Sequence, residues 1–116
     1  MPAAQEAFSY TRDNVHRGGL VEAALKELCF RYLAGDLDQS DPSRFEPRER
    51  AALDWAHAIA SDSDRADDEL WSRLHGLFSD EELVELGCAI GFELGRQHFL
   101  RTLGADPDAA RASELR

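Results

Sequence analysis

The stretch from Ser79 to Gly104, SDEELVELGCAIGFELGRQHFLRTLG, constrains the fold of this chain more than any other part of its sequence. Ser79 and Glu82 form a capping-box pattern, and the acidic residues after Ser79 favour the positive end of a helix dipole. Gly104 supplies a left-handed stop, with Arg101 in the last turn before it. The sequence therefore predicts one long helix with a defined start and a defined end.

Neighbouring elements are expected to cover much of this helix. Its main apolar stripe has helical spacing and consists of Leu83, Leu86, Ile90 and Leu94. Apolar residues also occur on its other sides, namely Val84, Phe92, Phe99, Leu100 and Leu103. A helix that is apolar on several sides is typically packed on several sides.

Three glycines recur at spacing four along the same helix, Gly87, Gly91 and Gly95. Each costs about 1 kcal/mol of helix stability relative to alanine in an exposed interior. We therefore expect that a packing contact along this flank compensates for the cost. Because a missing side chain lets another backbone come close, we expect the helix predicted over Leu20–Ala34 to lie across Gly87 and Gly91.

Four shorter helices are predicted before the long one, over residues 3–16, Leu20–Ala34, Pro47–Ala60 and Asp68–Phe78. In the first three of these, the expected inward residues are Ala7, Phe8 and Val15; Val21, Leu25, Leu28, Cys29 and Tyr32; and Ala52, Trp55, Ala56 and Ile59. The fourth carries the apolar residues Leu70, Trp71, Leu74, Leu77 and Phe78. A polar loop with one short turn is expected over residues 36–46, and a solvated connection over residues 61–67. The fold class is all-α with about five helices, as one domain over residues 1–104 and a loose tail over residues 105–116.

Composition excludes several classes of partner. A chain of 116 residues with a net charge of −10 is one domain that is poorly suited to bind nucleic acid or an anionic membrane. No apolar run approaches the roughly 18–20 residues that cross a bilayer, and the start of the chain lacks a signal pattern, so a cytoplasmic location is expected. Reduced cysteines are expected there.

Several segments together resemble the carboxymuconolactone decarboxylase and alkylhydroperoxidase D-like superfamily. They are GGLVEAALKELCFRYLA, RERAALDWAHAIA, DDELWSRLHGLFSDEELVELGCAIGF and RQHFLRTLG, and the similarity extends over about residues 18–104. The resemblance implies an all-helical fold that usually assembles as dimers, trimers or hexamers.

The resemblance also implies where a redox centre would lie. In redox members of that superfamily, activity depends on the pattern E-x11-C-x2-C-x3-H. Aligned on Glu27, the two cysteine positions of this pattern fall on Gln39 and Pro42, and the histidine position falls on Glu46. The segment between Gly35 and Pro47 is also too short for the catalytic helix. The chain is thus expected to be a shortened relative without the redox motif.

Three residues remain as candidate catalytic groups, Glu27, Cys29 and His98. Glu27 could act as a buried acid or base, although its spacing to Arg31 favours a helical ion pair. Cys29, like Cys88, is favoured as a core residue, because no neighbour in sequence activates the thiol. A disulfide between the two cysteines is not predicted.

His98 has two interpretations. Together with Arg96, Gln97, Gly91 and Gly95 it could shape a cleft for a small carboxylate, although a hydrogen-bonded histidine at a helix contact is favoured. The four histidines lack metal-ligand spacing, so neither a metal nor a cofactor is expected. The sequence HRGG at residues 16–19 is interpreted as a helix-breaking turn rather than a phosphate loop.

The leading hypothesis is a non-redox, non-enzymatic helical protein that acts through self-association, as a dimer or higher oligomer, or through a protein partner. Two observations motivate it: the cysteine pair of the redox pattern is missing, and Gly87, Gly91 and Gly95 are aligned on one flank of the long helix. One alternative is a decarboxylase-like enzyme that handles small carboxylates by acid–base chemistry with Glu27 and His98. Another is a lone-cysteine hydroperoxidase that uses Cys29.

Overall fold

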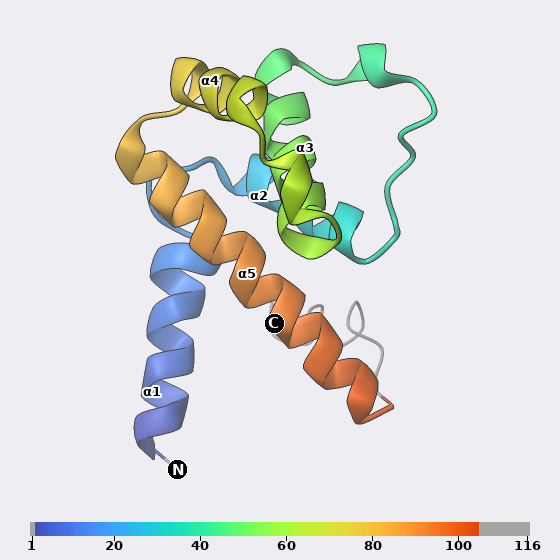
Figure 1. Ribbon diagram of the computed structural model, residues 1–116. Helices are drawn as coiled ribbons and strands as arrows, with labels where there is room; N and C mark the ends of the chain where they lie inside the picture. Colours follow the sequence, from blue (N-terminus) through green and yellow to red (C-terminus); the bar gives the residue numbers. More distant parts are fainter. Residues whose placement is uncertain (1, 105–116) are drawn as a thin grey trace.

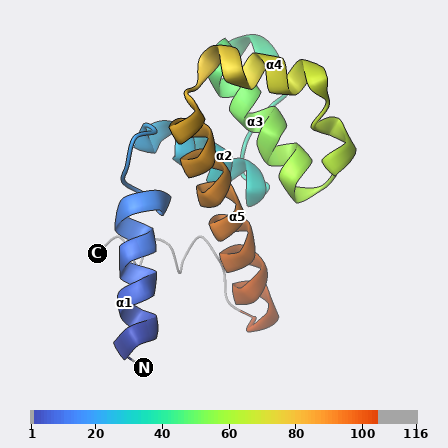
Figure 2. The same cartoon turned by 60° about the vertical axis from the view of Figure 1, so that its left-hand side comes forward.

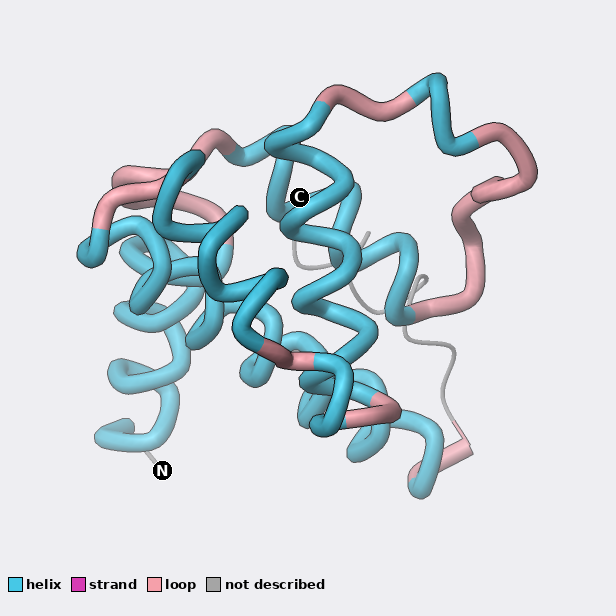
Figure 3. The backbone as a smooth tube through the Cα atoms, turned by 45° about the horizontal axis from the view of Figure 1, so that its top comes forward, coloured by secondary structure: helices cyan, strands magenta, loops and turns pink. Residues whose placement is uncertain are grey.

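The structure, a computed structural model, describes residues 2–104 and contains five α-helices with no strand among those residues (Figures 1 and 3). The helices are α1 (Pro2–Thr11), α2 (Ala23–Leu33), α3 (Pro47–Ala60), α4 (Asp68–Leu77) and α5 (Asp80–Thr102). Short helical turns join them: the π-helical turn η1 (Arg12–His16) and the 3-10 turns η2 (Pro42–Arg44) and η3 (Ser63–Arg65). The all-α prediction and the long last helix are confirmed. The tail expected over residues 105–116 lies outside the described residues.

Local capping chemistry sets the helix ends, as the sequence predicts. The backbone N–H of Glu82 donates to the Ser79 hydroxyl at 3.2 Å, and the Glu82 carboxylate accepts from the Ser79 N–H at 2.9 Å. Asp67 Oδ1 accepts from the N–H of Leu70 at 2.9 Å and starts α4. Gly35 and Gly104 follow α2 and α5 with φ of 77° and 75°, the left-handed conformation that ends a helix.

The helices pack mainly on one side of α5. Helices α2 and α3 both contact α5, α4 packs against α3, and α1 joins the rest through η1 and stands apart from α3 and α4 (Figures 1 and 2). The buried apolar core comes from α2 to α5 and the segment before α2, and includes Val21, Leu25, Cys29, Ala52, Trp55, Ala56, Leu70, Leu74, Phe78, Leu83, Leu86 and Ile90. This arrangement leaves the opposite side of α5 without a neighbour in the described part of the chain.

The expectation that neighbours cover much of α5 holds for its inner side, where Leu83, Leu86 and Ile90 are buried, but not for apolar residues on its other sides. Val84 is 68% exposed, Phe99 62% and Leu103 65%, because α2, α3 and η1 reach only the inner side of the helix. Ile59 of α3, which is expected from the sequence to face inward, is also exposed, and so is the apolar Trp71 of α4. Ala7 of α1 is exposed as well.

Helix α2 does not pack across the three aligned glycines Gly87, Gly91 and Gly95. A Cβ at Gly87 would lie 2.9 Å from Cη2 of Trp55, so this glycine makes room for an indole ring and not for a backbone. At Gly91 and Gly95 an added Cβ would meet no described atom within 4 Å. The predicted contact of α2 with Gly87 and Gly91 is wrong, because α2 packs on the inner side of α5, where the Gln97 amide donates to the carbonyl of Phe30.

Polar contacts to α5 hold the turn before α2 in place. Glu85 accepts hydrogen bonds from the N–H groups of Leu20 at 2.8 Å and Val21 at 2.6 Å, so α2 begins at Ala23 and not at Leu20. The fully buried Lys26 ammonium donates to the carbonyls of Val15 and Gly18, both at 2.5 Å, and pairs with Glu85 at 3.1 Å.

The close approach of Glu85 explains the second glycine of the turn. Gly19 has φ of 107°, a backbone conformation that residues other than glycine rarely adopt. An added Cβ at Gly19 would also lie 2.0 Å from Oε1 of Glu85. The helix-breaking interpretation of residues 16–19 is confirmed.

Candidate functional site

An apolar groove lies where α3 and α4 meet the N-terminal half of α5. Its volume is about 460 Å³, and it is lined by Trp55, Trp71, His75, Asp80, Leu83, Val84, Gly87 and Cys88. The two indoles meet edge to face with their ring centroids 5.8 Å apart, and the packing of Trp55 over Gly87 shapes the wall. Most of the lining is apolar, so the groove suits contact with an apolar surface better than proton transfer.

The groove opens onto the outward face of α5. The exposed residues of this face recur every three or four positions and are Asp80, Val84, Cys88, Gly91, Gly95, His98 and Thr102. Asp80, Val84 and Cys88 belong to both the groove and the face, so the two form one surface. Within residues 2–104 nothing covers this surface, which makes it the strongest candidate for a binding site.

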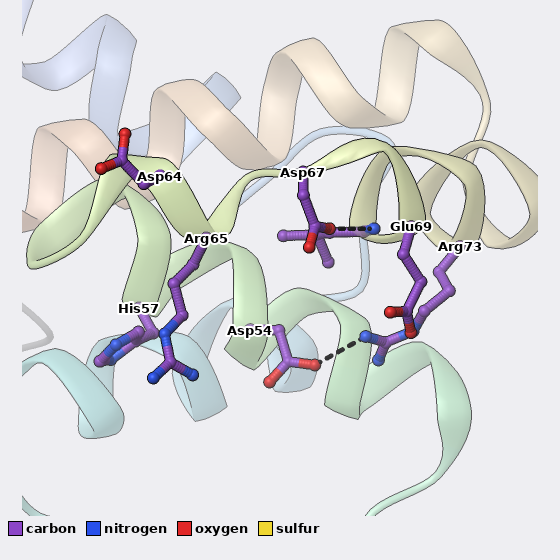
Figure 4. A pocket seen from close by; sticks show the side chains of 8 residues that line it. Asp54, His57, Asp64, Arg65, Asp67, Glu69 and Arg73 are labelled. Atoms are coloured by element: carbon purple, nitrogen blue, oxygen red, sulfur yellow. Dashed lines mark hydrogen bonds and ion pairs between the residues drawn. The ribbon is translucent and has the colours of Figure 1, made fainter.

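A second cavity, of about 420 Å³, is polar and lies between α3, η3 and α4 (Figure 4). It is lined by Asp54, His57, Asp64, Arg65, Asp67, Glu69, Leu70 and Arg73. Some of its charged groups already have partners within the protein: Asp54 on α3 pairs with Arg73 on α4 at 2.9 Å, and Asp67 caps α4. The ion pair links α3 to α4, and the cap fixes the start of α4 after the connection that the sequence predicts as solvated.

His57 connects this polar cavity to α2. The hydroxyl of Tyr32 lies 2.5 Å from Nδ1 of His57, in a contact that ties α2 to α3. Burial and the nearby charge of Asp54 both raise the pKa of the Tyr32 hydroxyl. A phenol with a raised pKa stays protonated at neutral pH, so it acts here as a hydrogen-bonding group.

A buried carboxylate, Glu93, lies at the contact between η1 and the inner side of α5. Its oxygens lie 2.8 Å from Nε2 of His16, 2.8 Å from Nε of Arg96 and 2.7 Å from the Gln97 amide nitrogen. The His16 ring stacks on Phe30 with ring centroids 4.5 Å apart. Burial alone would raise the pKa of Glu93, but the hydrogen bonds from His16, Arg96 and Gln97 outweigh it and lower the pKa to about 2.

This cluster resembles a catalytic site in composition but not in access. His16, Glu93 and Gln97 are each at most 1% exposed, so a substrate cannot reach the carboxylate while η1 stays docked on α5. The arrangement is that of a structural anchor: a charge stabilised by hydrogen bonds fixes the turn that carries α1.

The structure does not place the three predicted catalytic candidates in one site. Cys29 is buried in the core, and burial raises the pKa of its thiol to about 12. Glu27 is exposed on α2, and His98 is exposed on the outward face of α5. None of the three lines the apolar groove or the polar cavity.

One further prediction about these residues is wrong, and one alternative interpretation has no support. Cys88 is exposed and lines the apolar groove, so its predicted core role is wrong; both cysteines are free. The less favoured interpretation of His98, a cleft for a small carboxylate, has no support, because Arg96 and Gln97 turn inward to Glu93 while Gly91 and Gly95 face open space.

The sequence held a signal for Glu93 that periodicity alone could reveal. Glu93 and Gln97 continue the buried positions Leu86 and Ile90 at alternating spacings of four and three. A carboxylate on an apolar stripe indicates a buried polar contact. The apolar groove had no comparable signal, because it depends on how α3 and α4 meet α5.

Metal and membrane features are absent from the part of the chain that the structure describes. Among residues 2–104, no group of three or more His, Cys, Asp or Glu side chains is placed to hold a metal ion. Within the same range, every helix is too short or too polar to span a bilayer.

Comparison with protein-family models, with curated proteins and with solved structures finds no match to this chain. The resemblance to the alkylhydroperoxidase D-like superfamily therefore stays a prediction from the sequence, and any functional inference depends on the geometry of the molecule itself.

Proposed function

We propose that this chain is a non-enzymatic helical protein that acts by self-association, and that the apolar groove with the outward face of α5 is its contact surface. The observation that carries the proposal is the groove itself, an apolar hollow of about 460 Å³ that opens onto an uncovered helix face. Val84 at 68% exposure and Trp71 at 40% lie at its edge. Burying such side chains stabilises association by about 25 cal/mol per Å² of apolar surface.

The two enzymatic alternatives have less support. A thiol with a pKa of about 12 supplies almost no thiolate at neutral pH, which disfavours a hydroperoxidase that depends on Cys29. An acid–base enzyme needs its two groups to face one enclosed substrate, whereas Glu27 and His98 both lie on the exposed surface.

Val84→Arg tests the proposal. Because Val84 is largely exposed, the substitution should leave the monomer folded, with an unchanged circular dichroism spectrum. A charged guanidinium in an apolar contact costs several kcal/mol. The dissociation constant of the dimer should therefore rise by about tenfold to a thousandfold. Sedimentation velocity over micromolar concentrations measures the shift.

Ala24→Arg is the matched control, because Ala24 is also an exposed helical residue but lies on α2, away from the groove. This variant should sediment like the parent chain. A parent chain that sediments as a monomer at these concentrations would refute the proposed function, and equal effects of the two arginines would refute the assigned surface.

A further inference from the structure

We propose that two copies of this chain pair through antiparallel α5 helices, with the two-fold axis passing beside Gly91. The inference rests on the proposed self-association and goes further, because it fixes the direction in which the second copy binds. Three properties of α5 carry it: the position of its exposed face, its charges and the location of the groove.

The exposed face is centred on the middle of the helix. Gly91 is the middle residue of α5 (Asp80–Thr102), and the face extends in both directions from it, to Asp80 and to Thr102. In a symmetric dimer each copy uses the same surface, so a two-fold axis at the midpoint lets two faces overlap along their whole length. Val84 and His98 are equidistant from Gly91 in sequence, so Val84 of one copy lies at the same level as His98 of the partner subunit.

The charges of α5 favour the antiparallel direction. The first turn carries Asp80 and Glu81, both exposed, and the last turn carries the exposed Arg101. An antiparallel pair brings Arg101 of the partner subunit to the same level along the helix as the acidic turn, and it opposes the two helix dipoles favourably. A parallel pair would place acidic turns together in a chain whose net charge is already −10.

The shape of the surface gives the same direction. The groove occupies only the N-terminal half of α5, whereas the C-terminal half carries the 62% exposed Phe99 and small or polar side chains. In the antiparallel pair, each C-terminal half lies along the partner subunit's groove, and both grooves are covered. The open space at Gly91 and Gly95 allows the two helix axes to approach to about 8 Å, the lower end of the usual range.

Mixed cysteine cross-linking tests the direction. In a Cys88→Ser background, which leaves only the buried Cys29, one sample carries Val84→Cys and a second carries His98→Cys. After the two samples are mixed, equilibrated and oxidised, the antiparallel pair brings the new thiols of different chains together. The mixture should then give at least about tenfold more disulfide-linked dimer than either sample alone, because paired thiols react at millimolar effective concentration.

Each other outcome has a defined meaning. Val84→Cys cross-linking alone as well as in the mixture would indicate a parallel pair and overturn the inference. Sedimentation as a dimer with no cross-link in any sample would overturn it too, while self-association itself stands. Monomers throughout would refute both. Ala24→Cys mixed with His98→Cys controls for random collision and should give no product, and equal melting temperatures of all variants show that the fold is kept.

Discussion

At the scale of single residues, Glu93 shows how a charge is kept inside this fold. The carboxylate has no exposed surface, yet hydrogen bonds from His16, Arg96 and Gln97 hold its pKa at about 2, below the ordinary value of 4.5. A carboxyl whose pKa is lower in the folded chain than in the unfolded chain contributes stability above the unfolded pKa. That contribution is lost as the pH falls through the folded pKa.

The stability of the chain should therefore fall as the pH falls from about 4.5 to about 2, with Glu93 contributing on the order of 3 kcal/mol of the loss. Urea unfolding at a series of pH values measures the free energy of unfolding. Glu93→Gln should be less stable at neutral pH and lose less stability in this window, whereas the exposed Glu81→Gln should follow the parent chain. Parallel curves for Glu93→Gln and the parent chain would contradict the anchor role.

The two thiols should differ in reactivity for a reason that is also local. Cys29 has no exposed surface and a pKa of about 12, whereas Cys88 is exposed at the groove. Titration of the native chain with a chromogenic disulfide, at a concentration low enough to keep the groove uncovered, should label one thiol per chain quickly and the second only after unfolding. Cys88→Ser should abolish the fast phase and Cys29→Ser should not; fast labelling of Cys88→Ser would show that the core opens readily.

At the scale of elements, the glycines of α5 separate into two kinds. Gly91 faces open space, so Gly91→Ala should stabilise the monomer by up to about 1 kcal/mol through helix propensity. Gly87→Ala places a Cβ 2.9 Å from the indole of Trp55, so overpacking should make it less stable than Gly91→Ala by on the order of 1–3 kcal/mol. Thermal unfolding of both variants at low concentration measures the difference, and equal melting temperatures would contradict the Trp55 contact.

Helix limits could be predicted because their causes are local in sequence. The capping box of Ser79 and Glu82, the Asp67 cap and the proline at the start of α3 each act within one turn, and α3 begins at Pro47 and ends at Ala60 as predicted. The start of α2 could not be predicted in this way. Its preceding residues Leu20 and Val21 bind Glu85, which lies more than 60 residues further along the chain.

At the scale of the whole molecule, the sequence could not show which side of α5 is covered. Val84 and Leu83 are equally apolar neighbours, yet Val84 is 68% exposed and Leu83 is buried, because only the placement of α2 and α3 distinguishes the two sides. The pairing of His16 with Glu93 spans 77 residues and has no local pattern. For the same reason, the groove between α4 and α5 could be found only from the structure.

The inner side of α5 has a consequence for how the chain is made. Three of its glutamates bind basic side chains of earlier segments: Glu82 pairs with Arg48 at 2.8 Å, Glu85 with Lys26, and Glu93 with His16. Because a ribosome synthesises the chain from its N-terminal side onward, these side chains emerge before the helix that binds them has been synthesised. Because Leu83, Leu86 and Ile90 of α5 belong to the buried core, the earlier helices have no complete core until α5 has left the exit tunnel.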